Sequence, residues 1–217
     1  MPVSSAVGEV LQGVFAAVGR VRPTDKPLHP RGVVQRGTVD RRGSAEHFGV
    51  PWLDDPGSDG ALVRFSRGAG LPDALPDVLG IALRVDLGER PGDQLFATTG
   101  RSVPGRFLLI PRRSANVSPT TYSTLQPYRT PTGPVVLAAT PEIHGPDVRI
   151  SLTAARPTGP WHEFGTLTVD LTAADDKALS FDPMLNEIPG LTNYRWVRRV
   201  REGAYRSARR SRVRAAG

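Results

Sequence analysis

Near the end of the sequence, one tyrosine lies between two arginines at helical spacing. Arg201 precedes Tyr205 by four positions and Arg212 follows it by seven, so in a helix all three side chains project from one face. An arginine one turn before a tyrosine favours the ionised phenol, and a phenolate can bind ferric iron, including the iron of haem. The alternative is an amphipathic helix whose tyrosine packs against the protein while its arginines are solvated. The spacing alone leaves both interpretations open.

The net charge of the chain is concentrated around this tyrosine. The formal charge is +7, yet residues 191–217 hold nine arginines and one glutamate, whereas residues 1–190 hold 19 basic and 20 acidic residues. A basic helix also suits the phosphates of nucleic acid or of anionic lipid, which is a second class of function. Few aromatic residues accompany these arginines and no nucleic-acid-binding motif is present, so we expect no nucleic acid partner.

Composition and motifs exclude several other kinds of chemistry. The 217-residue chain has no cysteine, which rules out disulfides, thiolate metal sites and iron–sulfur clusters. Its four histidines form none of the i, i+4 pairs typical of zinc sites, so a hydrolase such as a phosphodiesterase ranks low. A nucleophile elbow, a phosphate loop and a dinucleotide fingerprint are all missing. The N-terminus lacks the features of a secretory signal and no apolar run reaches 18 residues, so we expect a cytoplasmic protein without a membrane span.

The rest of the chain predicts the elements that must position these groups. An apolar stripe over residues 4–19 predicts a helix within residues 1–22. Over residues 26–172, short β-rich runs separated by Gly and Pro predict an antiparallel barrel or sandwich. The expected strands are Gly32–Val39, Ala61–Arg67, Gly80–Leu87, Gln94–Thr98, Arg106–Pro111, Val135–Ala139, Val148–Ala155 and Glu163–Leu171.

The C-terminal region, residues 173–217, completes a single domain that spans residues 1–217. A short capped helix is expected from Thr172 onward, followed by a loop at 181–190. A long basic helix, Leu191–Val213, then carries the tyrosine.

Two C-terminal segments resemble those of the haem catalase superfamily. Residues 201–212 are similar to the proximal haem segment of that family, in which an arginine lies four before the axial tyrosine and another seven after it. Phe181-Asp-Pro183 and Pro189-Gly190 resemble the approach to that helix.

Three further segments resemble the same family, in the same order along the chain. Lys26-Pro-Leu-His29-Pro-Arg-Gly32 is similar to the distal segment that leads into the first barrel strand. Val63-Arg64-Phe65-Ser66 and Asp77–Val85 resemble the strands that follow. The chain therefore looks like a short catalase-like protein, related to catalase-type peroxidases.

The resemblance implies an α+β fold and a haem b cofactor. The fold is an antiparallel eight-stranded β-barrel with an N-terminal helix and a C-terminal basic helix that carries the axial ligand. Tyr205 would be that ligand, with Arg201 hydrogen-bonded to its oxygen. The haem propionates would bind the cationic side chains of Lys26, Arg64 and Arg212.

The resemblance also implies the distal chemistry. His29 would take a proton from a bound peroxide and return it to the departing oxygen, with Ser66 fixing its orientation, so that heterolytic O–O cleavage yields a ferryl intermediate. The family's distal asparagine is replaced by Thr98, or by Thr99 if the register slips, and threonine donates only one hydrogen bond. This change indicates a peroxidase with weak or no catalase activity, an oxidoreductase that acts on hydrogen peroxide or organic hydroperoxides with an unknown reductant.

Other interpretations of the same sequence remain open. The protein could be an enzyme that rearranges hydroperoxides, or a catalase-fold haem carrier or sensor without turnover. It could also be a basic protein that binds nucleic acid or an anionic membrane. The sequence leaves the oligomeric state open, including a homodimer.

Overall fold

The computed structural model describes residues 34–68, 75–113, 120–144, 147–175 and 179–197. The chain divides into two compact units, one formed by Arg31–Tyr194 and the other by Met1–Pro30 with Arg195–Gly217. Only residues 195–197 of the second unit are described, and they form a helical turn. The predicted N-terminal helix and most of the basic helix therefore lie outside the described residues, as do Lys26, His29, Arg201, Tyr205 and Arg212.

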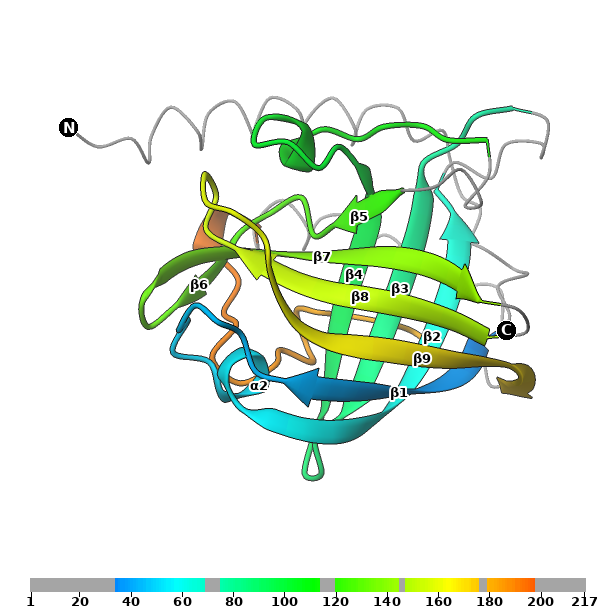
Figure 1. Cartoon of the computed structure of the whole chain (residues 1–217), viewed down its shortest axis with the longest axis horizontal. Helices are drawn as coiled ribbons and strands as arrows, with labels where there is room; N and C mark the ends of the chain where they lie inside the picture. Colours follow the sequence, from blue (N-terminus) through cyan, green and yellow to red (C-terminus); the bar gives the residue numbers. More distant parts are fainter. Residues whose placement is uncertain (1–33, 69–74, 114–119, 145–146, 176–178, 198–217) are drawn as a thin grey trace, which may run out of the picture. The chain divides into compact units, whose positions relative to one another are not determined.

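The unit Arg31–Tyr194 is built on a closed antiparallel β-barrel of eight strands with one additional strand (Figure 1). Its elements are β1 (Val34–Arg42), α2 (Pro51–Asp54), β2 (Pro56–Arg67), β3 (Leu79–Asp86), β4 (Pro91–Thr99), η1 (Gly105–Phe107), β5 (Thr121–Ser123), β6 (Tyr128–Thr130), β7 (Gly133–His144), β8 (Asp147–Ala155) and β9 (His162–Asp175). The sheet order is β5-β4-β3-β2-β1-β9-β8-β7-β6, and pairing of β5 with β7 closes the barrel. In Figure 1, β3 and β4 run steeply behind the nearly horizontal β7–β9, as expected for opposite walls of a barrel with tilted strands.

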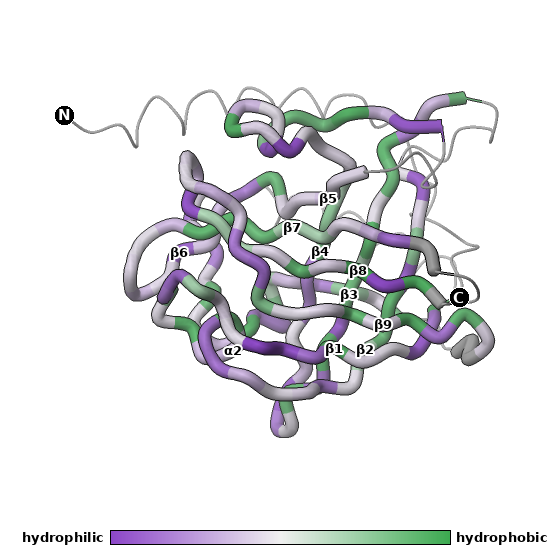
Figure 2. The backbone as a smooth tube through the Cα atoms, viewed as in Figure 1, coloured by the Kyte–Doolittle hydropathy of each residue, from purple (hydrophilic) through white to green (hydrophobic). Residues whose placement is uncertain are grey.

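Side chains point alternately inward and outward along each strand, and the inward-pointing ones that fill the barrel are mostly apolar. All eight barrel strands contribute to this core, through Val39, Val63, Leu83, Phe96, Tyr122, Leu137, Leu152 and Leu167. Burial raises the pKa of Tyr122 to about 12, so its hydroxyl is neutral at ordinary pH. Figure 2 shows that the C-terminal end of β1 is hydrophilic, in keeping with its sequence Asp40-Arg-Arg42. The apolar positions of period two that predict a barrel are thus the positions that form its core.

The predicted strand Arg106–Pro111 is wrong. This segment starts with the short helix η1 and continues as an extended chain that makes only an isolated bridge, between Thr99 and Leu109. The buried guanidinium of Arg106 explains the difference, since it donates to the carbonyl oxygens of Arg156 (2.9 Å) and Gly159 (3.1 Å) and lies 4.3 Å from the ring centroid of Trp161. Burial without a carboxylate lowers the pKa of Arg106.

Three further segments differ from the elements expected there. β5 and β6 lie between the expected strands Arg106–Pro111 and Val135–Ala139, where no strand is expected, because three-residue strands are too short to show a periodic pattern. The helix expected from Thr172 is wrong for residues 172–175, which extend β9 along β1, where Val34 pairs with Asp175. Residues 191–194 are not helical, since Thr192 bridges to Arg129 instead.

Candidate functional site

The register of the strands brings two of the predicted site residues to one face of the barrel. Arg64 on β2 pairs with Ala82 on β3, and Ser66 pairs with Gly80. Because paired residues in an antiparallel sheet point to the same side, Arg64 and Ser66 project away from the interior residue Val63. We call this side the outer face; on β2, β3 and β4 it comprises Leu62, Arg64, Ser66, Gly80, Ala82, Arg84, Asp93, Leu95, Ala97 and Thr99.

The part of the outer face beside Ser66 carries small side chains. Ser66 pairs with Gly80, and Gly80 pairs with Ala97, so three adjacent strands present a hydroxymethyl group, a hydrogen and a methyl group in one row. A Cβ on Gly80 would lie 2.8 Å from Oγ of Ser66, so glycine gives the hydroxyl its space. In the next row, Arg64 lies beside the methyl group of Ala82. This part of the outer face therefore carries small, largely apolar side chains beside the Ser66 hydroxyl and the Arg64 guanidinium.

The structure separates the two threonines at the end of β4. Thr98 is fully buried on the interior side, where its Oγ1 accepts a hydrogen bond from the backbone N–H of Leu79 (3.1 Å). The alternation of the strand places Thr99 on the outer face instead, two positions beyond Ala97. Thr99 is only 1% exposed, and its Oγ1 has no hydrogen-bond partner in the described part of the chain. Thr98 thus does not share a face with Arg64 and Ser66, whereas Thr99 does.

The guanidinium of Arg64 is held by a segment from near the end of the barrel unit. It lies 5.0 Å from the ring centroid of Phe181, and its Nη1 donates to the carbonyl oxygen of Leu179 (3.4 Å). Arg84, diagonally adjacent on the outer face, lies 5.5 Å from the same ring centroid. One buried aromatic ring is therefore shared by two arginines.

A buried carboxylate fixes this segment to β4. Asp93 accepts two hydrogen bonds from Arg84, each 2.6 Å long, and its Oδ2 also accepts the backbone N–H of Asp182 (2.7 Å) and Nδ2 of Asn186 (2.8 Å). Asp93 is fully buried, and its hydrogen bonds with Arg84 raise the pKa of that guanidinium. Arg84 also donates to the carbonyl oxygen of Ser180 (2.9 Å). Sequence reasoning missed this network; its signal is an acidic residue on one strand opposite a basic residue on the next.

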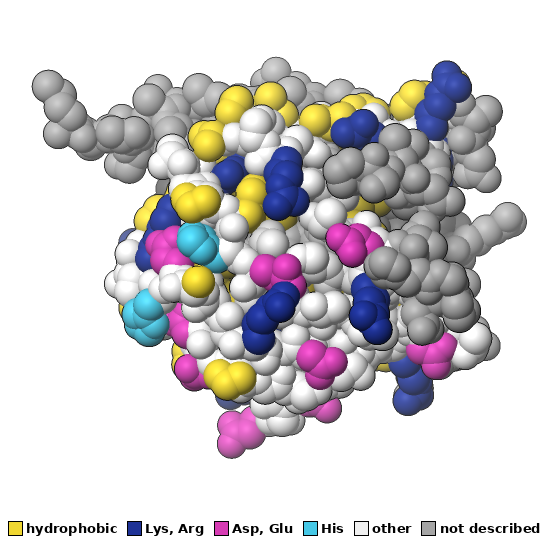
Figure 3. All heavy atoms as spheres, in the orientation of Figure 1, with side chains coloured by type: hydrophobic (Ala, Val, Ile, Leu, Met, Phe, Trp, Pro, Cys, Tyr) yellow, Lys and Arg dark blue, Asp and Glu magenta, His cyan; other side chains and the backbone are white. Residues whose placement is uncertain are grey.

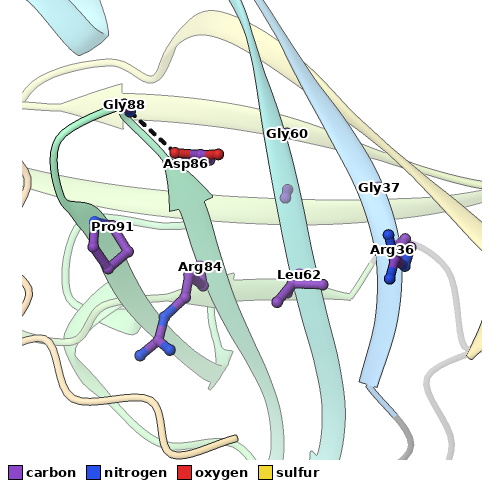
Figure 4. A pocket seen from close by; sticks show the side chains of 9 residues that line it. Arg36, Gly37, Gly60, Leu62, Arg84, Asp86, Gly88 and Pro91 are labelled. Carbon is purple, nitrogen blue, oxygen red and sulfur yellow. Dashed lines mark hydrogen bonds between the residues drawn. The ribbon is translucent and has the colours of Figure 1, made fainter. Parts of the chain in front are cut away.

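Around Leu62 and Arg84, the outer face has a hollow of about 400 Å³ (Figure 4). Arg36, Leu62, Arg84 and Asp86 contribute side chains, and several glycines leave space between them. Figure 4 shows the Arg84 guanidinium turned away from Arg36, while Asp86 accepts the backbone N–H of Gly88 (3.0 Å). The nine lining residues include no histidine, serine or tyrosine, and Asp86 is the one acidic side chain among them.

The surface of the described barrel shows no single-sign patch on the face drawn in Figure 3, where acidic and basic side chains are interspersed. Among the described residues, no helix is long and apolar enough to cross a membrane. The same part of the chain contains no cluster of three or more His, Asp or Glu side chains able to hold a metal ion.

Comparison with solved structures defines the class of fold. The chain is similar to a fungal catalase solved at 1.9 Å, with a TM-score of 0.58 and 11% identity over 85% of this chain and 58% of that one. It is similar also to catalase A from Saccharomyces cerevisiae, with a TM-score of 0.57 and 11% identity over 85% of this chain and 60% of that one. The protein thus has a catalase-like fold and spans about three fifths of the length of these two catalases. No protein-family profile and no curated protein matches its sequence.

Proposed function

We propose that this protein is a haem-dependent peroxidase that reduces hydrogen peroxide or organic hydroperoxides. The observation that carries the proposal is the outer face of the catalase-like barrel, where Arg64 and Ser66 lie beside a floor of small side chains. The sequence pattern around Tyr205 supports it independently, because it supplies a phenolate at the spacing expected of an axial ligand.

The described residues fit haem b in chemistry. Gly80, Ala82 and Ala97 are small and apolar, which would suit contact with a flat, apolar ring, and Arg64 would supply a cation for a carboxylate at its edge. The buried hydroxyl of Thr99, which lacks a described partner, is a donor on the same face. When bound, haem supplies the iron at which the O–O bond of the peroxide is broken.

Each proposed residue has a separate task. Tyr205 binds the iron as a phenolate, which Arg201 stabilises by a hydrogen bond to the same oxygen. Lys26 and Arg212 join Arg64 in binding the two propionates. His29 removes a proton from the peroxide and returns it to the departing oxygen, while the hydroxyl of Ser66 fixes the tautomer and the orientation of the imidazole.

Of the two threonines that the sequence offers for the distal role, we assign it to Thr99. A hydroxyl on the interior side of β4, already bonded to the Leu79 amide, is on the wrong side of the sheet to meet a ligand on the outer face. Thr99 supplies one donor where two would be needed for efficient dismutation, which favours peroxidase turnover over catalase turnover.

The two threonines provide a matched pair of variants. Thr98→Val leaves the buried Leu79 amide without a partner, so it should lower the free energy of unfolding by about 1–3 kcal/mol without slowing the reaction with peroxide. Thr99→Val removes an unpartnered hydroxyl, so stability should be unchanged or slightly raised, while the peroxide reaction slows by about tenfold for one lost hydrogen bond. Urea titration and stopped-flow absorbance measure the two effects. The reverse pattern, with Thr98→Val slowing the reaction, would restore Thr98 as the distal residue.

Titration of the purified protein with hemin tests the proposed function directly. The wild type should bind one equivalent and show the high-spin ferric absorption spectrum of a tyrosinate-ligated haem. Tyr205→Phe removes the phenolate and should abolish or strongly alter this spectrum, whereas Tyr194→Phe, on a tyrosine outside the proposed pattern, should leave it unchanged. If the wild-type protein takes up no hemin, the proposed function is wrong. If the spectrum of Tyr205→Phe is unaltered, only the assignment of Tyr205 as the iron ligand is wrong.

A further inference from the structure

Gly80 is a glycine inside strand β3 that the backbone of the barrel does not require. Its φ lies outside the left-handed region that favours glycine. A Cβ built on it would lie 3.5 Å from the carbonyl oxygen of Phe96, the nearest backbone atom, which is an ordinary van der Waals contact. Glycine within a strand is less favourable than alanine, because its unfolded backbone has more conformational freedom to lose. The fold alone therefore favours alanine at this position.

Two other strand glycines differ from Gly80 in this respect. A Cβ on Gly37 of β1 would lie 2.5 Å from the carbonyl oxygen of Thr168, and one on Gly165 of β9 would lie 2.7 Å from that of Asp40. At both positions two backbones approach too closely for a side chain, so the pairing of β1 with β9 requires glycine. Among the described residues, no backbone approaches Gly80 in this way, so the reason for its glycine lies in a side chain.

The side chain in question is that of Ser66 on β2. Its Oγ would lie 2.8 Å from a Cβ on Gly80, closer than real Cβ atoms come to another heavy atom. A serine hydroxyl can occupy three staggered positions about χ1, and a methyl group at position 80 would close the one that the structure shows, which leans over β3. With alanine at position 80 the barrel would still fold, but the Ser66 hydroxyl would turn away from β3.

A methyl group at position 80 would take little space from a ligand on the outer face. Residues paired in neighbouring strands point to the same side, so this methyl group would stand level with the Cβ atoms of Ser66 and Ala97, its partners on β2 and β4. It would not rise above the small side chains around it. The glycine therefore affects the direction of the Ser66 hydroxyl more than the room above the outer face.

We propose that Gly80 is a positioning residue: because it has no side chain, the Ser66 hydroxyl points over β3, the direction in which it acts in the peroxide reaction. The inference rests on the proposed function, in which this hydroxyl orients the imidazole of His29. It adds a requirement of its own, namely that a glycine unfavourable for the fold is needed for the reaction, and needed only through Ser66.

Gly80→Ala tests whether the fold needs this glycine, with Gly60→Ala as the matched control. Gly60 lies on β2, and a Cβ there would meet no atom within 4 Å. Both variants replace glycine by alanine in a strand, so each should raise the midpoint of thermal unfolding by about 1–4 °C. If Gly80→Ala unfolds at a lower temperature than the wild type, the barrel itself requires the glycine and the proposal is wrong.

The reaction with peroxide tests the effect on Ser66. In the haem-loaded protein, Gly80→Ala and Ser66→Ala should each slow this reaction by about tenfold, the value for one lost hydrogen bond. Gly60→Ala should react at the wild-type rate, and all three variants should bind hemin with a dissociation constant within about twofold of the wild-type value. In a Ser66→Ala background, Gly80→Ala should have no further effect, because the hydroxyl that it would displace is absent.

A measurement without haem reports the hydroxyl directly. In the ligand-free protein, the three-bond couplings between the Hα and Hβ protons of Ser66 give its χ1 rotamer in NMR spectra. These couplings should change in Gly80→Ala and stay the same in Gly60→Ala. A purely structural role of the glycine would alter stability without moving this rotamer.

The opposite outcomes overturn the proposal in distinct ways. A wild-type rate in Gly80→Ala or in Ser66→Ala, or an unchanged Ser66 rotamer, shows that the glycine does not act by directing the hydroxyl. A loss of rate that persists in the Ser66→Ala background shows that the methyl group acts on the ligand itself. If the wild type binds no hemin, the proposed function fails and the role in the reaction with it, while the couplings still report whether Gly80 sets the Ser66 rotamer.

Discussion

Asp93→Ala should lower the free energy of unfolding by about 3–5 kcal/mol, because it leaves the largely buried guanidinium of Arg84 without its carboxylate. The variant also removes the acceptor for the backbone N–H of Asp182 and for the side chain of Asn186. Urea or thermal denaturation followed by circular dichroism gives the size of the loss. For a protein of this size, such a loss is a large share of the total stability.

Asp86→Ala is the control for this experiment. Asp86 lies on the same hairpin of β3 and β4, is exposed, and accepts a single hydrogen bond from the backbone of Gly88. Its replacement should cost less than about 1 kcal/mol. If the two variants lose the same stability, Asp93 does not anchor the segment that carries Phe181.

His29→Ala should slow the reaction of the haem-loaded protein with hydrogen peroxide by about 10²–10⁴-fold while leaving hemin affinity nearly unchanged. The reason is that the proposed imidazole transfers a proton between the two oxygens of the peroxide and does not bind the iron. Stopped-flow measurement of the haem absorbance after mixing with peroxide gives the rate.

His47→Ala is the matched histidine variant, since His47 is exposed on the barrel and lies 3.1 Å from a carboxylate oxygen of Asp54. It should react at the wild-type rate. A wild-type rate in His29→Ala would contradict the distal assignment. A wild-type protein that binds hemin and does not react with peroxide would be a haem carrier or sensor, the non-enzymatic alternative that the sequence leaves open.

Much of the barrel could be predicted from the sequence because its long strands carry a clear period of two. Ala61–Arg67 and Val148–Ala155, for example, lie within the observed β2 and β8. The errors occur where a tertiary contact overrides the local pattern. Arg106 buries its guanidinium among backbone carbonyl groups, and its segment forms a short helix instead of a strand. The local sequence does not indicate that one of these carbonyl groups belongs to Arg156, 50 residues away.

For the candidate residues, the sequence determines which share a face of one strand and leaves their neighbours on other strands open. A four-residue motif on one strand is enough to place Arg64 and Ser66 on a common face, because alternate residues of a strand point the same way. Choosing between Thr98 and Thr99 requires the register between β3 and β4, which the sequence of β4 alone does not determine. Phe181 contacts Arg64 and Arg84, which lie on strands distant from it in the sequence. The residues next to Phe181 in the sequence do not indicate these contacts.

The pairing of β1 with β9 has a consequence for how the protein is made. Gly37 pairs with Val169, so the strand that starts the barrel meets its second neighbour only after most of the chain has been synthesised. Until then β1 is a bare edge, available for wrong pairing with other nascent chains. Four of its nine residues are charged, Arg36, Asp40, Arg41 and Arg42, and charge on an exposed edge discourages aggregation. This charged stretch thus lies on the edge that stays unpaired until β9 has been synthesised.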